Sequence, residues 1–156
     1  MKRLKPIGPL LPLLLVALFA SGRIAHAAQI GGTVTTTVTI VEDSELVDDV
    51  TCAVTGAPCI AFGASGITLK LNGYTMTGQG NAKTGCGGTA TAGEFGIDVN
   101  ARQDVTILGP GLVRKFRNQG IRVLNSTGAM INGVITSTNC SSGIIVIGGG
   151  ENHLHQ

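Results

Sequence analysis

Hydrophobic residues along this chain fall into short runs in which apolar and polar positions alternate. A period of two is typical of β-strands, whereas a helix would place apolar residues three and four positions apart. After the first 27 residues, no stretch sustains the helical spacing. The alternating runs are separated by turn residues and lie at 33–40, 66–78, 96–99, 104–109, 120–123, 129–135 and 143–148. We therefore predict an all-β protein.

A recurring Gly-Ile pair narrows the choice of all-β architecture. The pairs begin at residues 66, 96, 120 and 143, so they are 30, 24 and 23 residues apart. A second element repeats with them, because Val105-Thr106-Ile107 is matched by Ala129-Met130-Ile131 24 residues later. Two or three strands in a repeat of this length predict a β-solenoid, in which each coil stacks on the previous one. We assign the longer first interval to a loop inserted at residues 79–94.

Alternation within the repeat predicts which side chains face the interior. In Gly-Ile-x-Val, the Ile and Val side chains share one face of the strand. The residues expected to stack in the core are Ile97, Val99, Ile121, Val123, Ile144 and Val146. The outward column at position x consists of Thr68, Asp98, Arg122 and Ile145. This column predicts an ion pair between Asp98 and Arg122 on adjacent coils, worth about 0.2–1 kcal/mol.

Three segments resemble the right-handed parallel β-helix repeat proteins of the pectin-lyase-like superfamily. They are "ITLKLNGYTMTG" (67–78), "GIDVNARQDVTILGPGLVRKF" (96–116) and "GIRVLNSTGAMINGVITSTN" (120–139). The resemblance implies a right-handed coil, the usual hand of parallel crossovers. It also implies an N-terminal cap with the first strands at 28–65, followed by parallel coils at 66–156.

The last segment, "GIIVIGGGENHLHQ" (143–156), begins another coil without a capping helix or a polar final strand. An open solenoid end leaves backbone donors and acceptors unpaired and attracts another strand. We expect a short solenoid that is truncated at its C-terminal end and belongs to a longer protein. The alternative is that a partner or a second copy of the chain covers this end by self-association.

The first 27 residues have the pattern of a secretory signal peptide. Lys2, Arg3 and Lys5 precede an apolar run at 10–20, and Ala25-His26-Ala27 supplies small residues at a cleavage site. The run is shorter than the roughly 20 residues that a membrane-spanning helix needs. We expect a secreted or periplasmic protein, in contact with a membrane only if the leader stays uncleaved.

Removal of this leader reverses the sign of the net charge. The whole chain is formally +2, but the mature part keeps seven basic and nine acidic residues, a formal net charge of −2. The basic balance that would favour nucleic acid therefore belongs to the leader, and we expect no nucleic-acid partner.

Four cysteines, Cys52, Cys59, Cys86 and Cys140, lie in the exported part. An even number in an exported chain favours disulfides, and four cysteines allow three connectivities. Cys52 and Cys59 bracket a turn-rich loop, so we favour that pair, which leaves Cys86 with Cys140. A zinc site has little support because there is no C-x-x-C motif, and we expect no metal.

Enzymes of the superfamily that this chain resembles act on acidic polysaccharides. A lyase of this kind needs carboxylates for calcium and an Arg or Lys as the base. The weak surface-site candidates for these roles are Asp98, Asp104, Arg114, Lys115, Arg117 and Arg122. No compact set of three acidic residues accompanies them, and a solvated basic turn is the favoured interpretation of 114–117. A hydrolase would need paired aspartates and a histidine on the coils, but the one Asp-Asp pair lies in the acidic stretch 42–49.

The catalytic residues, if any, are therefore unknown, and no cofactor is expected. The most favoured function is a secreted β-helix scaffold with carbohydrate-related binding or a surface role, and polysaccharide is the expected partner. The alternative is a polysaccharide lyase or glycoside hydrolase acting on acidic polysaccharide. A row of threonines at 33, 35, 37 and 39 also resembles surfaces that bind ordered ligands, although ordinary strand alternation explains it equally well.

Overall fold

The computed structural model describes residues 27–80, 86 and 92–155, and this part of the chain contains strands and no helix. The predicted all-β class is confirmed. The described ranges accordingly hold no helix long and apolar enough to cross a membrane. The predicted leader, apart from Ala27, lies outside the described residues. The strands are β1 (Ala28–Val34), β2 (Val38–Ile40), β3 (Ser44–Cys52), β4 (Ile60–Phe62), β5 (Thr68–Lys70), β6 (Thr75–Thr77), β7 (Ile97–Asn100), β8 (Thr106–Arg114), β9 (Ile121–Thr127), β10 (Met130–Ser137), β11 (Ile144–Gly150) and β12 (His153–His155).

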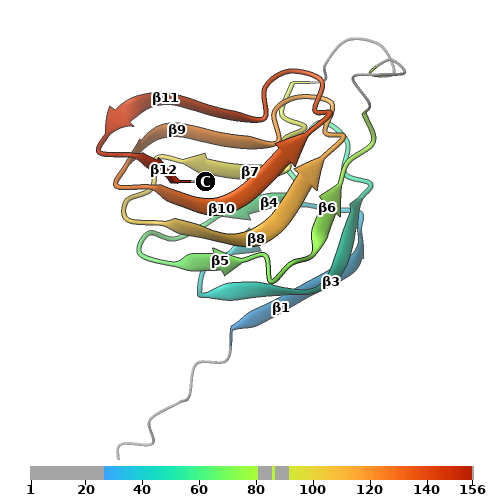
Figure 1. Cartoon of the computed structure of the whole chain (residues 1–156), viewed down its shortest axis with the longest axis horizontal. Helices are drawn as coiled ribbons and strands as arrows, with labels where there is room; N and C mark the ends of the chain where they lie inside the picture. The colour runs from blue at the N-terminus through green and yellow to red at the C-terminus, as the bar shows by residue number, and fades with distance from the viewer. Residues whose placement is uncertain (1–26, 81–85, 87–91, 156) are drawn as a thin grey trace, which may run out of the picture.

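These strands pair in parallel and form two sheets (Figure 1). Sheet A has the order β1-β3-β5-β8-β10-β12, with β6 beside β3 and β8, and sheet B has the order β11-β9-β7-β4-β2. The chain passes from one sheet to the other after each strand, except that β5 and β6 follow each other in sheet A. Each return to a sheet adds the next strand in order, which is compatible with the β-solenoid predicted from the repeat.

Sheet B is built around one inward column of apolar side chains. Strand register places Val38, Ile60, Ile97, Ile121 and Ile144 side by side across its five strands. Ile60, Ile97 and Ile121 are completely buried. The predicted inward face is therefore confirmed at the centre of this sheet.

At the edge of this sheet the predicted inward column continues to Val146, but that residue is not buried. Val99 and Val123 are buried, but Val146, the next residue in their column, is 39% exposed, and Ile144 is only half-buried. β11 is the outer strand of sheet B. Alternation predicts which way a side chain points, but its burial also needs a neighbouring strand on both sides.

The glycines before Ile97 and Ile121 are explained by close contact between neighbouring strands. A Cβ atom on Gly96 would lie 2.5 Å from the carbonyl oxygen of Gly120, and one on Gly120 would lie 2.7 Å from that of Gly143. Gly66 differs, because its φ is 70° and a Cβ atom there would meet nothing within 4 Å. Two different backbone requirements thus produce the same Gly-Ile sequence.

Because the strand after Gly66 belongs to sheet A and not to sheet B, the predicted outward column is wrong at Thr68. Thr68 lies in sheet A and pairs with Thr106, whereas the residue beside Asp98 in sheet B is Ala61 of β4. The column is therefore Thr39, Ala61, Asp98, Arg122 and Ile145. The long interval in sheet B runs from Ile60 to Ile97, 37 residues, and it contains the loop expected at 79–94, of which 81–85 and 87–91 lie outside the described residues.

The segment expected to cap the N-terminal end contributes strands to both sheets. β1 pairs with β3 in sheet A, and β2 pairs with β4 in sheet B. Ile30, Val34 and Ile40 from this segment are buried in the same core as the later strands.

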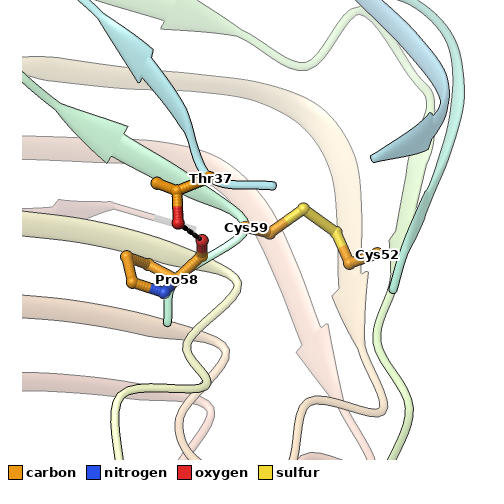
Figure 2. Close-up of a disulfide and its surroundings, with 4 residues drawn as sticks. All are labelled: Thr37, Cys52, Pro58 and Cys59. Carbon is orange, nitrogen blue, oxygen red and sulfur yellow. Dashed lines mark hydrogen bonds between the residues drawn. A yellow bond between two sulfur atoms is a disulfide. The ribbon is translucent and has the colours of Figure 1, made fainter. Parts of the chain in front are cut away.

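Both disulfides have the pairing expected from the sequence, Cys52 with Cys59 and Cys86 with Cys140. The first joins the end of β3 to the start of β4, and beside it the Thr37 hydroxyl donates to the Pro58 carbonyl at 2.7 Å (Figure 2). The second attaches the loop at 79–94 to the turn that follows β10. Two disulfides are typical of an oxidising environment, extracellular or periplasmic.

Val123 and Val47 provide a matched test of this packing, since they are the same residue type but Val123 is buried and Val47, on β3, is 40% exposed. We predict that Val123→Ala lowers the free energy of unfolding by about 2 kcal/mol, because it removes buried methyl groups and leaves a cavity. Val47→Ala should change it by less than about 0.5 kcal/mol. Urea denaturation followed by circular dichroism measures both, and equal losses would contradict the assigned burial.

Candidate functional site

Asp98 and Arg122 form the best-defined polar contact on the outer face of sheet B. Arg122 Nε donates to Asp98 Oδ1 at 2.7 Å, and Arg122 Nη2 donates to Asp98 Oδ2 at 2.9 Å. The Arg122 guanidinium also lies over the Phe95 ring, with Cζ 4.0 Å from the ring centroid. The predicted ion pair is therefore present. Both carboxylate oxygens and one face of the guanidinium are engaged within the protein, which fixes the side chains in place.

Arg117 takes part in a second ion pair, at the turn after β8. Its Nη1 lies 3.4 Å from Glu94 Oε1, and its Nη2 donates to Gln79 Oε1 at 3.1 Å. The same Glu94 oxygen accepts the backbone N–H of Gly56 at 2.9 Å. A cavity of about 10 Å³ adjoins this cluster, with space for one water molecule at most. Arg117 therefore joins its own turn to the segments that contain Gln79 and Glu94, and Glu94 in turn holds the turn at Gly56. The adjoining cavity is too small for a substrate.

Arg114, Lys115 and Asp104 lie apart from these pairs. Arg114 is at the end of β8 on the outer face of sheet A, where its Nε donates to the Thr77 hydroxyl at 3.3 Å. Lys115 and Asp104 have φ values of 59° and 52°, so both occupy turn positions in the left-handed region. The structure therefore brings together Asp98 and Arg122 but does not gather the six candidates into one site.

Carboxylates of the acidic stretch at 42–49 accept hydrogen bonds from the next segment of sheet A. Asp43 Oδ1 accepts the backbone N–H of Thr68, and Asp49 Oδ1 accepts that of Thr75, each at 2.8 Å. Glu45 Oε2 accepts a hydrogen bond from Asn72 Nδ2 at 3.2 Å. These carboxylates satisfy amide groups of the next strands. Among the described residues, no three His, Cys, Asp or Glu side chains are grouped as metal ligands would be.

A column of polar side chains crosses the outer face of sheet A, and we call it the polar column. Strand register aligns Thr33, Thr51, Thr77, Arg114 and Ser137 from β1 to β10. All five are exposed or half-exposed. At about 4.8 Å per strand, four spacings extend over about 19 Å.

The polar column replaces the threonine row noted in the sequence. Thr33 and Thr39 lie in different sheets, and the hydroxyl of Thr37 is bonded to the Pro58 carbonyl. Residues in a row along one strand are two positions apart in the sequence, whereas residues in a column across strands are a whole coil apart. The column was missed because its members are separated by 18 to 37 residues.

Sequence reasoning also missed two asparagines that connect adjacent strands, the buried Asn139 and the half-buried Asn152. Asn139 is buried and bonds to both the N–H of Phe116 and the carbonyl of Val113. Asn152 accepts the N–H of Ala129 and donates to the carbonyl of Ser126. Their only sequence signal is a position in a turn after a strand, where asparagine is common for many reasons.

A scan against protein-family models, a search of curated proteins and a search of solved structures each returned no match to this chain.

The Asp98–Arg122 contact leads to a prediction of coupling. A double-mutant cycle with Asp98→Asn and Arg122→Gln should give a coupling energy of about 1 kcal/mol, because the pair is bidentate and partly buried. Thermal or urea denaturation at low and high salt measures it.

Glu45 and Lys70 provide the matched control, since they are neighbours in sheet A with opposite charges and greater exposure. The Glu45→Gln and Lys70→Gln cycle should give about 0–0.5 kcal/mol. Equal coupling in the two cycles would show that the Asp98–Arg122 geometry contributes nothing beyond surface charge.

Proposed function

We propose that this protein is an exported scaffold that binds polysaccharide through the polar column of sheet A. We further propose that its two parallel sheets form a right-handed β-solenoid of the kind found in the pectin-lyase-like superfamily. The observation that supports binding is the polar column itself, which presents hydroxyl groups and one guanidinium on consecutive strands.

The chemistry of the polar column suits a sugar chain. Threonine and serine hydroxyls donate and accept hydrogen bonds, as sugar hydroxyls do, and a guanidinium can hold a carboxylate in a bidentate contact. Its members are register neighbours on successive strands, so a linear polymer can contact several of them at once. The presence of Arg114 favours a polymer that carries carboxylate groups over a neutral one.

Binding is better supported than catalysis because three of the six candidate catalytic groups, Asp98, Arg117 and Arg122, already form ion pairs within the protein. Asp98 is bonded to Arg122 through both oxygens, and Arg117 is bonded to Glu94 and Gln79. A lyase would need a base that is free to approach a substrate proton and carboxylates directed at a common point. Lyase or hydrolase activity remains the alternative proposal.

Affinity electrophoresis in gels containing polygalacturonate or a neutral soluble glucan tests the binding proposal. The wild-type protein should be retarded by polygalacturonate more than by the glucan. The double variant Thr51→Val/Arg114→Gln should weaken binding at least about tenfold, because it removes one neutral and one charge-assisted hydrogen bond.

Thr39→Val is the matched control, since Thr39 is an exposed threonine in sheet B and lies outside the polar column. It should bind like the wild type. Equal retardation of all three proteins, or no retardation of any, would contradict the proposal. Release of unsaturated or reducing sugar during the assay would instead favour the enzymatic alternative.

A further inference from the structure

Exposed apolar side chains are concentrated at one end of the two sheets. Of the seven large hydrophobic residues that are exposed in the described part of the chain, two, Val41 and Val47, lie near β2 and β3. The remaining five are Met130, Ile135, Val146, Ile147 and Leu154, on β10, β11 and β12. We call these five residues, with the free edges of β11 and β12, the β11 end.

The backbone at the β11 end is also available for pairing. β11 and β12 are the outer strands of sheets B and A, and no described strand pairs with their outer sides. β12 covers only Met130–Asn132 of β10, which leaves the outer edge of 134–137 without a described partner strand. Unpaired strand edges next to apolar side chains are a typical site for strand addition.

A groove at this end provides a place for apolar side chains. It has a volume of about 440 Å³ and is lined by Gly133, Val134, Ile135, Thr136 and Ile144. β11 (Ile144–Gly150) contains no charged residue. Charged residues and prolines usually protect a strand edge from association, and neither protects this one.

Charge and exposure distinguish this end from the opposite one. The N-terminal segment 28–52 contains five acidic residues, all at 42–49, and no basic residue, so two such ends would repel each other. At the opposite end, Val41, directly after β2, is the one exposed large hydrophobic residue of the described segment 28–43, against five at the β11 end. The β11 end has one acidic residue beside it, Glu151, so two such ends can approach without the repulsion that opposes contact between two N-terminal ends.

We infer that the β11 end is the interface of a symmetric dimer, in which it meets the same end of a second copy of this chain. A two-fold axis there places the same patch on both sides of the contact and closes the assembly at two copies. β11 pairs with its counterpart in antiparallel orientation, because a two-fold axis across a strand edge reverses the partner strand. Val146 and Leu154, which continue the buried columns of Val123 and Ile131, are then covered by the other copy.

The test uses protein expressed with its own leader and purified after export, with mass measured by light scattering during gel filtration. The wild type should have the mass of a dimer. Val146→Lys should have the mass of a monomer with unchanged circular dichroism, because a lysine on an edge strand is incompatible with a covered apolar interface. Leu154→Asp, on β12, is a second variant that should behave in the same way.

Two controls determine which end is used. Val47→Lys makes the same change at a residue of matched exposure, 40% against 39% for Val146, but away from the β11 end, and it should remain dimeric. Gln29→Pro alters the free edge of β1. The Ala28 N–H bonds toward β3, so the Gln29 N–H faces outward and a proline there removes an edge donor without breaking the pairing with β3. This variant should also remain dimeric. A monomeric wild type would overturn the inference, as would loss of the dimer in Gln29→Pro, which would indicate head-to-tail stacking.

Discussion

The register of the inward isoleucine column in sheet B determines the rest of the structure. Ile60, Ile97 and Ile121 stack directly, and this is possible only because Gly96 and Gly120 allow neighbouring strands to approach closely. A one-residue shift would turn the apolar side chains outward and bring polar ones into the core. Once this register is fixed, the outward neighbours follow, including the contact between Asp98 and Arg122.

Outward and turn positions have a second structural task, which is to connect each strand with the next. Carboxylates at 43 and 49 accept backbone N–H groups of β5 and β6, and the amides of Asn139 and Asn152 bridge to the preceding strands. These bonds satisfy backbone groups that the ladders leave unpaired at bends. Polar residues that look catalytic in the sequence, such as Asp98 and Arg117, therefore act as connections, and the proposed binding surface is the polar column.

Much of this fold follows from the sequence, because a solenoid repeats its requirements at a fixed interval. The 24- and 23-residue spacings of Gly-Ile correctly placed β7, β9 and β11 in one sheet, and so predicted the Asp98–Arg122 contact. The prediction was wrong at Gly66, because β4 follows Cys59 instead of glycine and the loop at 79–94 interrupts the interval. Exposure of Val146 was not predictable, since it depends on the absence of a described strand beyond β11 and not on local pattern.

The candidate site was less predictable than the fold. Charged residues were found as types, but their partners, such as Glu94 and Phe95, lie at the end of what looked like an inserted loop. The polar column is visible only when residues from five strands are aligned, and the alignment requires the register.

The most direct test of this register is a nuclear Overhauser experiment on isotope-labelled protein. The account predicts backbone contacts from Ile121 to both Ile97 and Ile144, in the pattern of parallel strands. Contacts from Ile121 to residues displaced by one or two positions, or an antiparallel pattern between β7 and β9, would contradict it.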